Sequence, residues 1–468
     1  MPDWVGVGRF RLLVVCFVVL AGVPASARAA AWPAYLHGPS HNSVSSESTI
    51  TPSLAASLAP QWHWAAPAAV GGQPSAALYA SPTVSGGRVF LGSNTGVFYA
   101  LSLSSGKRIW SRDLGYAPTL TCPARGITAT ASVAADPARG GAATVYIQSA
   151  TGVLYALDAA TGTVVWQTQL TPVSATQNGY YGWSSPTVVG RRVYVGLASQ
   201  CDQPLVRGGV VSVDQSSGVP LASYWSVPNG AVGASVWTSV AAANGSVYAT
   251  TGNGDEAVGH DQGDAVSIVR LNGSTMARDD IWTVPAGERP VDADFGGSPT
   301  LFRATVHGTA TDLVAACDKN GLLYAWRSGA LSIGPVWSRR IDTGAGANCF
   351  AAPIIKSGAL YQAGGATTIA GTATAGSVAR LKPATGAVVW QTPLPAAALG
   401  SPALDGAGVL AVPTYDSSAG TANGVYLLNT ADGSVLRHLG TTKIFSQPIF
   451  AGGRLLIASV TDGLTAYG

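Results

Sequence analysis

Charged side chains are scarce in this sequence. Lysine and arginine together number 26 and aspartate and glutamate 23 among 468 residues, which leaves a formal net charge of +3. So few charges, so evenly balanced, argue against a nucleic-acid partner and against binding to an anionic membrane surface. Long apolar runs are also lacking, because no stretch after residue 29 is long and apolar enough to span a membrane. Abundant glycine and 13 tryptophans instead favour a large, rigid all-β body.

Cysteine is rarer still, with five residues, and neither a CxxC nor a CxxCH motif occurs. Without those motifs the sequence indicates no c-type haem and no zinc knuckle. Beyond residue 29 the cysteines are Cys122, Cys201, Cys317 and Cys349. An even number in an oxidising compartment predicts two structural disulfides, and the sequence leaves all three connectivities open.

The first 29 residues have the pattern of a secretory signal peptide. Arg9 and Arg11 precede the apolar run LLVVCFVVLAGV, and small residues follow at 25–29. An uncleaved anchor is the alternative, but the run is short for a membrane span of roughly 20 residues. We therefore expect a mature chain from residue 30, of net charge about +1, that is secreted or periplasmic and has no membrane span.

A repeated unit organises the rest of the chain, and its clearest copy is ATVYIQSATGVLYALDAATGTVVWQTQL at 143–170. Three alternating runs rich in β-branched and aromatic residues predict three strands, and Gly162 lies in the second turn. Similar units end at or near Trp110, Trp166, Trp225, Trp282, Trp337 and Trp390, and two further units lack the tryptophan. We interpret the recurring tryptophan as a wedge packed between adjacent units rather than as a ligand-binding residue.

A second marker counts the units independently. A strand start of the Ser-Pro kind precedes each one, at Ser81, Ser132, Ser185, Ser239, Ser298, Ala352, Ser401 and Gln447. Both counts give eight units with a period of about 50 residues, which is typical of a β-propeller. The last unit lacks its outer strand, whereas LAPQWHW at 58–64 is a spare strand with tryptophan. We predict an all-β, eight-bladed propeller over residues 30–468, one domain closed by that N-terminal strand, in preference to two sandwiches or a solenoid.

Loops that depart from the repeat carry a resemblance to a known family. ALDAATGTVVW, VDADFGGSP, ASVWTS and the opening WPAYLHGPSHNSVSS resemble quinoprotein dehydrogenases, eight-bladed propellers that bind pyrroloquinoline quinone (PQQ) and calcium near the axis. The similarity covers essentially the whole mature chain and is greatest for the polyvinyl-alcohol dehydrogenase branch. It implies oxidation of an alcohol, small or polymeric, by hydride transfer to PQQ. Outer-membrane assembly scaffolds share the repeats, so the loop residues distinguish the two classes.

The resemblance assigns roles to individual residues. Trp237 matches the floor under the quinone ring, Asn253 a calcium ligand, and Asp294 the general base, which also lies against the metal. Lys319 matches the cation at the quinone oxygen, and Arg125 an arginine that pairs with a cofactor carboxylate. Asp292 is the other possible alignment for the base. Each also has an ordinary interpretation, as packing for Trp237 and as turn residues for Asn253, Asp294 and Lys319.

Two departures from the family pattern matter. Cys122 stands alone before Pro123, where family members often have two adjacent cysteines, and the calcium-binding glutamate has only Asp202 as its nearest counterpart. Since the chain has no haem motif, the resemblance implies a separate electron acceptor. The alternative function is a non-catalytic propeller that binds a cell-envelope partner, and convergence of Trp237, Asn253, Asp294 and Lys319 at one rim would favour the enzyme. A polysaccharide-cleaving propeller is less favoured, because Asp292 and Asp294 form the sole carboxylate pair.

Overall fold

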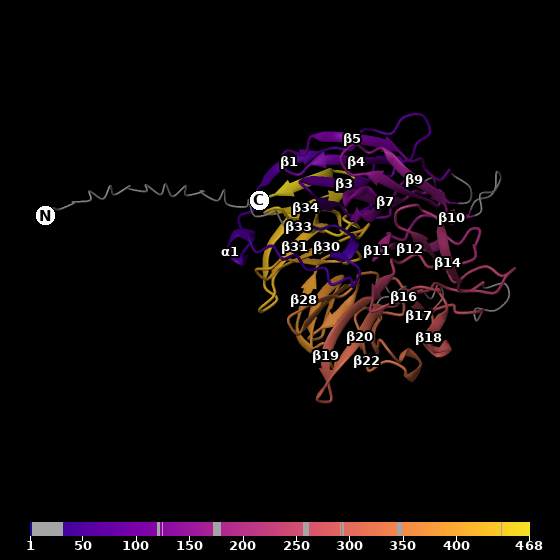
Figure 1. Cartoon of the computed structure of the whole chain (residues 1–468). Coiled ribbons are helices and arrows are strands. Elements are labelled where there is room, and N and C mark those ends of the chain that lie inside the picture. Colours follow the sequence, from indigo (N-terminus) through magenta and orange to yellow (C-terminus); the bar gives the residue numbers. More distant parts are fainter. Residues whose placement is uncertain are drawn as a thin grey trace.

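The computed structural model describes residues 1, 31–118, 122–123, 125–171, 179–255, 262–290, 292, 294–343, 349–440 and 442–468. The predicted signal peptide therefore lies outside the described residues, apart from Met1. Antiparallel sheets succeed one another around a common axis, and Figure 1 shows the ring that they form. The fold is an eight-bladed β-propeller, as the sequence predicted. None of the described helices has the length and hydropathy needed to cross a membrane.

The first four blades follow the chain in order. Blade 1 contains β2 (Thr83–Ser85), β3 (Arg88–Gly92), β4 (Val97–Ser102) and β5 (Arg108–Asp113). Blade 2 contains β6 (Ser132–Asp136), β7 (Ala142–Gln148), β8 (Val153–Asp158) and β9 (Val164–Gln169). Blade 3 contains β11 (Thr187–Val189), β12 (Arg192–Ser199), β13 (Gly209–Asp214) and β14 (Pro220–Trp225), with β10 (Tyr180–Tyr181) paired to β12. Blade 4 contains β15 (Ala241–Ala243), β16 (Ser246–Thr250), β17 (Ser267–Asn272) and β18 (Arg278–Thr283).

The last four blades complete the ring. Blade 5 contains β19 (Thr300–Val306), β20 (Thr309–Cys317), β21 (Leu322–Arg327) and β22 (Trp337–Arg340). Blade 6 contains β23 (Ile354–Lys356), β24 (Ala359–Gly364), β27 (Gly376–Leu381) and β28 (Val388–Leu394), and carries the hairpin β25 (Thr367–Ile369) and β26 (Thr372–Thr374). Blade 7 contains β29 (Ala403–Leu404), β30 (Val409–Pro413), β31 (Gly424–Asn429) and β32 (Val435–Gly440). Blade 8 contains β33 (Ile449–Ala451), β34 (Arg454–Ser459), β35 (Gly463–Tyr467) and β1 (Pro60–Trp64).

The described helices are short and lie between strands or before the first blade. They are α1 (Pro52–Ala55), η1 (Tyr35–His37), η2 (Pro137–Arg139), η4 (Ala286–Glu288), η5 (Leu331–Ile333) and η6 (Gly420–Ala422). Inner strands are buried on both faces, as in β7, whereas the outer strand β9 alternates between buried and exposed residues. Packing of each blade against two neighbours explains this difference, because the middle strands lie between the neighbouring blades whereas the outer strands lie at the rim.

Outer-strand tryptophans lock neighbouring blades together. The Trp166 indole N–H donates to the carbonyl of Gln215 in blade 3 (3.0 Å), and its ring lies where a Cβ on Gly218 would be. The same pair of contacts to the next blade is made by Trp62, Trp110, Trp337 and Trp390. Gly218 has φ +72°, which favours glycine, and a Cβ at this position would also clash with the Trp166 ring. Trp282 packs instead on Tyr324 and Trp326 of blade 5, and Trp225 carries the Arg207 guanidinium over its ring.

The N-terminal strand closes the ring. β1 pairs with β35 in antiparallel register, with Trp64 opposite Leu464 and His63 opposite Thr465. Figure 1 shows the indigo β1 beside the yellow C-terminal strands. The predicted closing strand is thus confirmed, and it leaves β35 without a free edge.

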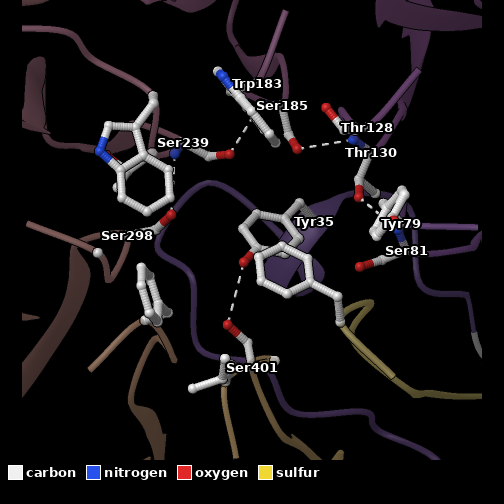
Figure 2. Close-up of a pocket in the computed structure, with 17 residues that line it drawn as sticks. Tyr35, Tyr79, Ser81, Thr128, Thr130, Trp183, Ser185, Ser239, Ser298 and Ser401 are labelled. Carbon is white, nitrogen blue, oxygen red and sulfur yellow. Dashed lines mark hydrogen bonds between the residues drawn. The ribbon is translucent and has the colours of Figure 1, made fainter. Parts of the chain in front are cut away.

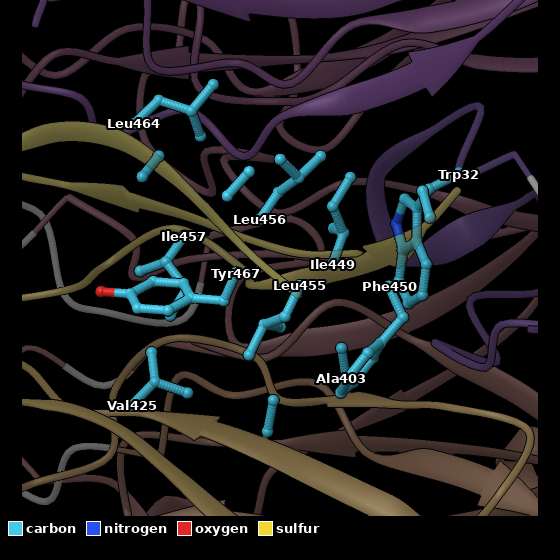
Figure 3. Close-up of a cluster of buried hydrophobic side chains, with 14 of the residues drawn as sticks. Trp32, Ala403, Val425, Ile449, Phe450, Leu455, Leu456, Ile457, Leu464 and Tyr467 are labelled. Atoms are coloured by element: carbon cyan, nitrogen blue, oxygen red, sulfur yellow. The ribbon is translucent and has the colours of Figure 1, made fainter. Parts of the chain in front are cut away.

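Before that strand, residues 32–47 form a belt across one face of the ring. Main-chain hydrogen bonds join this belt to the first strands of six blades, at Val84, Val133, Ala242, Leu301, Ile355 and Leu404. A seventh blade is reached through Gln447, whose side chain accepts from the Leu36 N–H and donates to the Ser43 hydroxyl. Trp32 is fully buried and belongs to the same hydrophobic cluster as Phe450 of blade 8 (Figure 3). The belt therefore ties distant blades to one another.

A candidate active site at the propeller axis

A narrow cavity runs along the axis and is lined by all eight blades. A Ser or Thr hydroxyl just before the inner strand accepts the N–H of the corresponding residue in the preceding blade, as Thr130 does from Ser81 (3.0 Å). The same bond links Thr130 to Ser185, Ser185 to Ser239, Ser239 to Ser298, Ala352 to Ser401, and Gln447 to Ser81. Figure 2 shows these hydroxyls around the axis. In blade 2 the ring position belongs to Thr130, two residues before the Ser132 marker taken from the sequence.

Tyr35 of the belt occupies the centre of this ring (Figure 2). Its hydroxyl lies 3.2 Å from the Ser401 hydroxyl. Burial raises the pKa of Tyr35, although hydrogen bonds to Ser401 and Ser298 oppose the shift. Ala352 of blade 6 has no hydroxyl, so the ring of hydroxyls is interrupted between Ser298 and Ser401. The Tyr35 hydroxyl lies at this interruption, near both serines.

A second cavity, of about 200 Å³, adjoins the axial one and shares Trp183, Trp237 and Phe445 with it. Its other lining residues are Ser199, Gln200, Cys201, Asp202, Ser235, Asp294 and Lys319. Four of the residues singled out in the sequence, Asp202, Trp237, Asp294 and Lys319, therefore meet in one place although they come from three different blades.

Asp294 is the most constrained group in this cavity. Its Oδ1 accepts the backbone N–H of Asn253 (2.8 Å), and its Oδ2 accepts from the Lys319 ammonium (2.6 Å). A Cβ on Gly252 would lie 2.2 Å from Oδ1, so glycine is needed for the carboxylate to reach this backbone. Burial raises the pKa of Asp294 to about 6, even though the positive charge of Lys319 opposes the shift.

Lys319 joins the acidic and the aromatic walls. Its ammonium lies 3.0 Å from Asp292 Oδ2 and 5.7 Å from the centre of the Trp237 ring. Burial disfavours the charged form, but the nearby Asp294 and Asp292 outweigh it and raise the pKa of Lys319. Phe350 lies against both, 5.9 Å from the ammonium and 5.9 Å from the Trp237 ring. Lys319 is therefore a fixed cation beside an aromatic platform.

Asn253 follows β16 and lies against the same carboxylate. Its carbonyl accepts the N–H of Ala234 (2.7 Å), which fixes the loop after β16 against the segment that leads to Trp237. The remaining carboxylates come from other loops, and one oxygen each from Asp202, Asp292 and Asp294 lies within 4.8 Å of the others. Asp202 sits at the exit of β12 and its Oδ1 accepts from the Ser199 hydroxyl.

Disulfides fix the loops that frame the cavity. Cys122 pairs with Cys201, which ties the loop before β6 to the one that carries Asp202. Cys317 pairs with Cys349 beneath the Asp294 segment, where Gly297 donates to the Cys317 carbonyl (3.0 Å). The sequence predicted two bridges and left their pairing open.

Arg125 lies beside the cavity rather than in it. Its guanidinium is 5.4 Å from the centre of the Trp183 ring and 6.0 Å from that of Tyr79. Trp183 lines the cavity that holds Asp294, so Arg125 contacts a ring in the wall of that cavity without lining the cavity itself.

Sequence reasoning missed several residues of this site. Trp183 stands two residues before Ser185, as Trp237 stands two before Ser239, so the repeat itself contained that signal. Gln200 lines the cavity, and its amide donates to the Pro123 carbonyl (2.9 Å). Asp318 is fully buried next to Lys319, and burial raises its pKa to about 7. No motif marked Gln200 or Asp318.

The family profile for the β-propeller domain of glucose, ethanol and alcohol dehydrogenases, the PQQ family, matches residues 32–329. The chain belongs to this family. A second profile, for the outer membrane protein assembly factor BamB, matches residues 277–467. Among curated protein sequences no match is found.

Solved structures share the propeller of the PQQ family. Quinohemoprotein alcohol dehydrogenase from Comamonas testosteroni is 16% identical with a TM-score of 0.71, over 93% of this chain and 80% of that one. A europium-containing methanol dehydrogenase is 15% identical with a TM-score of 0.68, over 92% of this chain and 89% of that one. BamB from Moraxella catarrhalis is 16% identical with a TM-score of 0.54, over 84% of this chain and 98% of that one. At such low identity these similarities establish the fold alone.

Proposed function

We propose that this chain is a PQQ-dependent dehydrogenase that oxidises an alcohol at the cavity of Asp294, Lys319 and Trp237. One observation supports the proposal most strongly. The buried Asp294 carboxylate is held between a backbone N–H and an ammonium beside an aromatic ring, at the axis of a propeller of the PQQ family. Perturbed titratable groups that converge in a cavity are typical of catalytic sites.

The residues present fit both groups that the family implies. Asp202, Asp292 and Asp294 offer oxygens within 4.8 Å of one another, and two oxygens of one calcium shell, each roughly 2.3–2.6 Å from the ion, lie no farther apart than about 5 Å. Asp294 and Asp202, with Asn253 next to them, would hold the metal. Trp237 offers a flat, uncharged face for the quinone ring, and the Arg125 guanidinium could pair with a carboxylate of the cofactor. When bound, PQQ would supply the two-electron acceptor and the metal ion a Lewis acid.

The position of each side chain suggests its role in the oxidation of the alcohol. A carboxylate oxygen of Asp294 would take the proton of the substrate hydroxyl. The Lys319 ammonium stays charged and holds developing negative charge next to Trp237. The Asn253 N–H fixes the direction of the base. Electrons would then leave to a separate acceptor.

The substrate and the compartment are finer parts of the proposal. The VDADFGGSP and ASVWTS stretches support an alcohol of the polymeric or secondary kind, as in the polyvinyl-alcohol dehydrogenase branch. We also propose that the chain works outside the cytoplasm as a single domain from residue 30. The signal-like start and two disulfides support an oxidising compartment.

Titration of the purified chain with PQQ and calcium tests the proposal. We expect saturable, calcium-dependent binding that stabilises the fold by about 2.7 kcal/mol at a hundredfold excess over Kd, seen as a rise in Tm. Trp237→Ala is expected to weaken binding about tenfold through lost stacking, and Asn253→Ala to weaken the calcium dependence. Asn272→Ala, in a hairpin turn of the same blade, is the matched control.

A second candidate function rests on the BamB profile over residues 277–467. It is a propeller that binds a cell-envelope protein without a cofactor. The same titration distinguishes the two, because absence of PQQ binding at any calcium concentration would contradict the dehydrogenase and favour the binding protein.

The ionisation of Asp294 gives a further prediction, for the cofactor-free protein in the presence of a chelator. We expect its carboxyl carbon, followed by NMR with labelled aspartate, to titrate near pH 6. Lys319→Gln removes the charge that lowers this pKa, so the midpoint should move to higher pH. Asp292→Asn removes a charge that raises it, so the midpoint should move to lower pH. Shifts of the same sign in both variants would contradict the assigned couplings.

A further inference from the structure

The hydroxyls that line the axial cavity lack acceptors for their own protons. Ser81, Thr130, Ser185 and Ser239 are each at most 5% exposed, and each accepts one backbone N–H at 2.8 to 3.0 Å. No residue in the described part of the chain accepts a proton from any of these four hydroxyls. A buried donor without an acceptor is costly, so the missing partners must lie in the cavity that these side chains line.

Water is the partner that this cavity suits. Its volume is about 80 Å³, whereas one water needs roughly 10–15 Å³ and two to four polar neighbours. A hydroxyl group has one proton and two lone pairs, and the backbone N–H occupies one lone pair of each ring hydroxyl. Each hydroxyl can therefore still donate one hydrogen bond and accept another. Hydroxyls and water pass protons along a chain by this pair of bonds.

The axial cavity reaches toward both faces of the ring. On one side it shares Trp183, Trp237 and Phe445 with the cavity of Asp294. On the other side, a third cavity of about 120 Å³ lies between the belt and the first strands of blades 2 and 3. The lining of this third cavity includes the exposed Pro39, so it reaches the surface. A passage from the cavity of Asp294 to the face crossed by the belt therefore runs through the axial cavity.

Tyr35 and Ser185 lie where the axial cavity meets the third cavity, because these two residues line both. Figure 2 shows Tyr35 amid the ring hydroxyls, and its own hydroxyl lies 3.2 Å from that of Ser401. Burial raises the pKa of Tyr35, so the hydroxyl keeps its proton and gives one up only as it receives another. A link in a proton relay does the same.

Oxidation of an alcohol needs an exit for protons. Conversion to a carbonyl compound releases two protons and two electrons, and the electrons pass by way of the cofactor to the separate acceptor. We propose that the axial cavity holds a column of ordered water that carries these protons toward the belt, with the Tyr35 hydroxyl as the link to the surface. The role in proton release rests on the proposed dehydrogenase function, whereas the water column does not.

A crystal structure of the full chain without PQQ, at a resolution that shows ordered water, tests the column first. We expect waters within hydrogen-bond distance of the Ser81, Thr130, Ser185 and Ser239 hydroxyls, and a continuous row of them from Trp237 to Tyr35. An axial cavity without ordered water would overturn the proposal.

The two half-reactions then test proton release. The chain is loaded with PQQ and calcium, reduced with an alcohol, and mixed with ferricyanide, which takes electrons but no protons. A pH-indicator dye follows the two protons that then appear. We expect them at least about tenfold more slowly in Tyr35→Phe, which lacks the hydroxyl, and in Ser185→Val, which fills the junction. The preceding reduction by the alcohol, followed by absorbance, should keep its rate, because no proton has to leave the protein in that step.

The chain supplies a control for each variant. Ala352 occupies a ring position without a hydroxyl, so we expect Ser185→Val to fold. Tyr248→Phe removes a hydroxyl that donates to the Ser328 carbonyl (3.0 Å), and Tyr248 lines neither the axial nor the third cavity, so proton release should stay fast.

Proton release at the normal rate in Tyr35→Phe and Ser185→Val would overturn the relay, and so would equal slowing of both half-reactions in these variants. If no alcohol reduces the loaded, unaltered chain, the dehydrogenase function itself is refuted. The crystal structure then decides by itself whether the water column exists.

Discussion

Asp294→Asn, loaded with PQQ and calcium, is expected to oxidise alcohols about 10²–10⁴ times more slowly than the unaltered chain. Asparagine keeps the size of the side chain and an oxygen that accepts the Asn253 N–H (2.8 Å). It cannot take a proton from a substrate hydroxyl. The loss should therefore appear in kcat and in kcat/KM alike, as expected for an interaction made in the transition state.

Absorbance and thermal shift on the same preparation show whether PQQ is still bound, so that loss of cofactor is not mistaken for loss of the base. Asp405→Asn is the matched control. Asp405 is fully buried in blade 7, burial raises its pKa to about 6, and its Oδ1 accepts the Val409 N–H (2.7 Å). It lines no cavity near the site, so its variant should keep nearly full activity. More than about a tenth of normal activity in Asp294→Asn would refute Asp294 as the base.

The repeat made the fold predictable from the sequence. Strand periodicity predicted the blades. The final unit lacks its outer strand and the N-terminal segment LAPQWHW is a spare strand, which together predicted the pairing of β1 with β35. Tryptophans such as Trp166 recur because each needs the same carbonyl and turn glycine in the next blade. Trp225 and Trp282 share the sequence pattern but differ in partners, because Trp225 meets Arg207 and Trp282 meets the aromatic rings of Tyr324 and Trp326.

The candidate site was predictable only where a residue recurs or stands next to a motif. Trp237, Asp294 and Lys319 were identified, and they do meet in one cavity. The disulfide pairing depends on which loops meet in space, and Gln200 lies in a loop whose length is unlike any other unit.

The belt showed itself in the sequence only through the resemblance of WPAYLHGPSHNSVSS to the segment before the first blade of the family, because it binds the blades mainly through its own backbone. Its residues follow neither a strand nor a helix period. Leu36, His37, His41 and Ser43 have positive φ angles of 54°, 74°, 62° and 55°. Side chains rarely adopt that region unless surrounding contacts hold them there. Those contacts are the bonds to seven blades, none of which exists until the ring has formed.

Deletion of residues 2–65 is expected to abolish cooperative folding. It leaves blade 8 with three strands and a free β35 edge, and removes both the belt and the Trp62 wedge on Gly106. Loss of a buried tryptophan alone costs about 3–5 kcal/mol, while whole domains are stable by only about 5–15 kcal/mol. Urea unfolding followed by tryptophan fluorescence should show a broad transition without a folded baseline, together with aggregation.

A circular permutant separates the contributions of the strand and the belt. Ala59 and Gly468 exchange backbone hydrogen bonds of 3.2 and 3.1 Å, so a two-residue Asn-Gly turn fits between Gly468 and a transplanted segment 59–65. A chain of residues 66–468, this turn and 59–65 restores β1 without the belt. We expect it to fold cooperatively at a lower urea midpoint, and a synthetic peptide of residues 31–48 to raise that midpoint. An equal midpoint in the permutant and the full chain would show that β1 alone closes the ring. A permutant that fails to fold would place the decisive contribution in the belt, where one segment of backbone is hydrogen-bonded to seven blades.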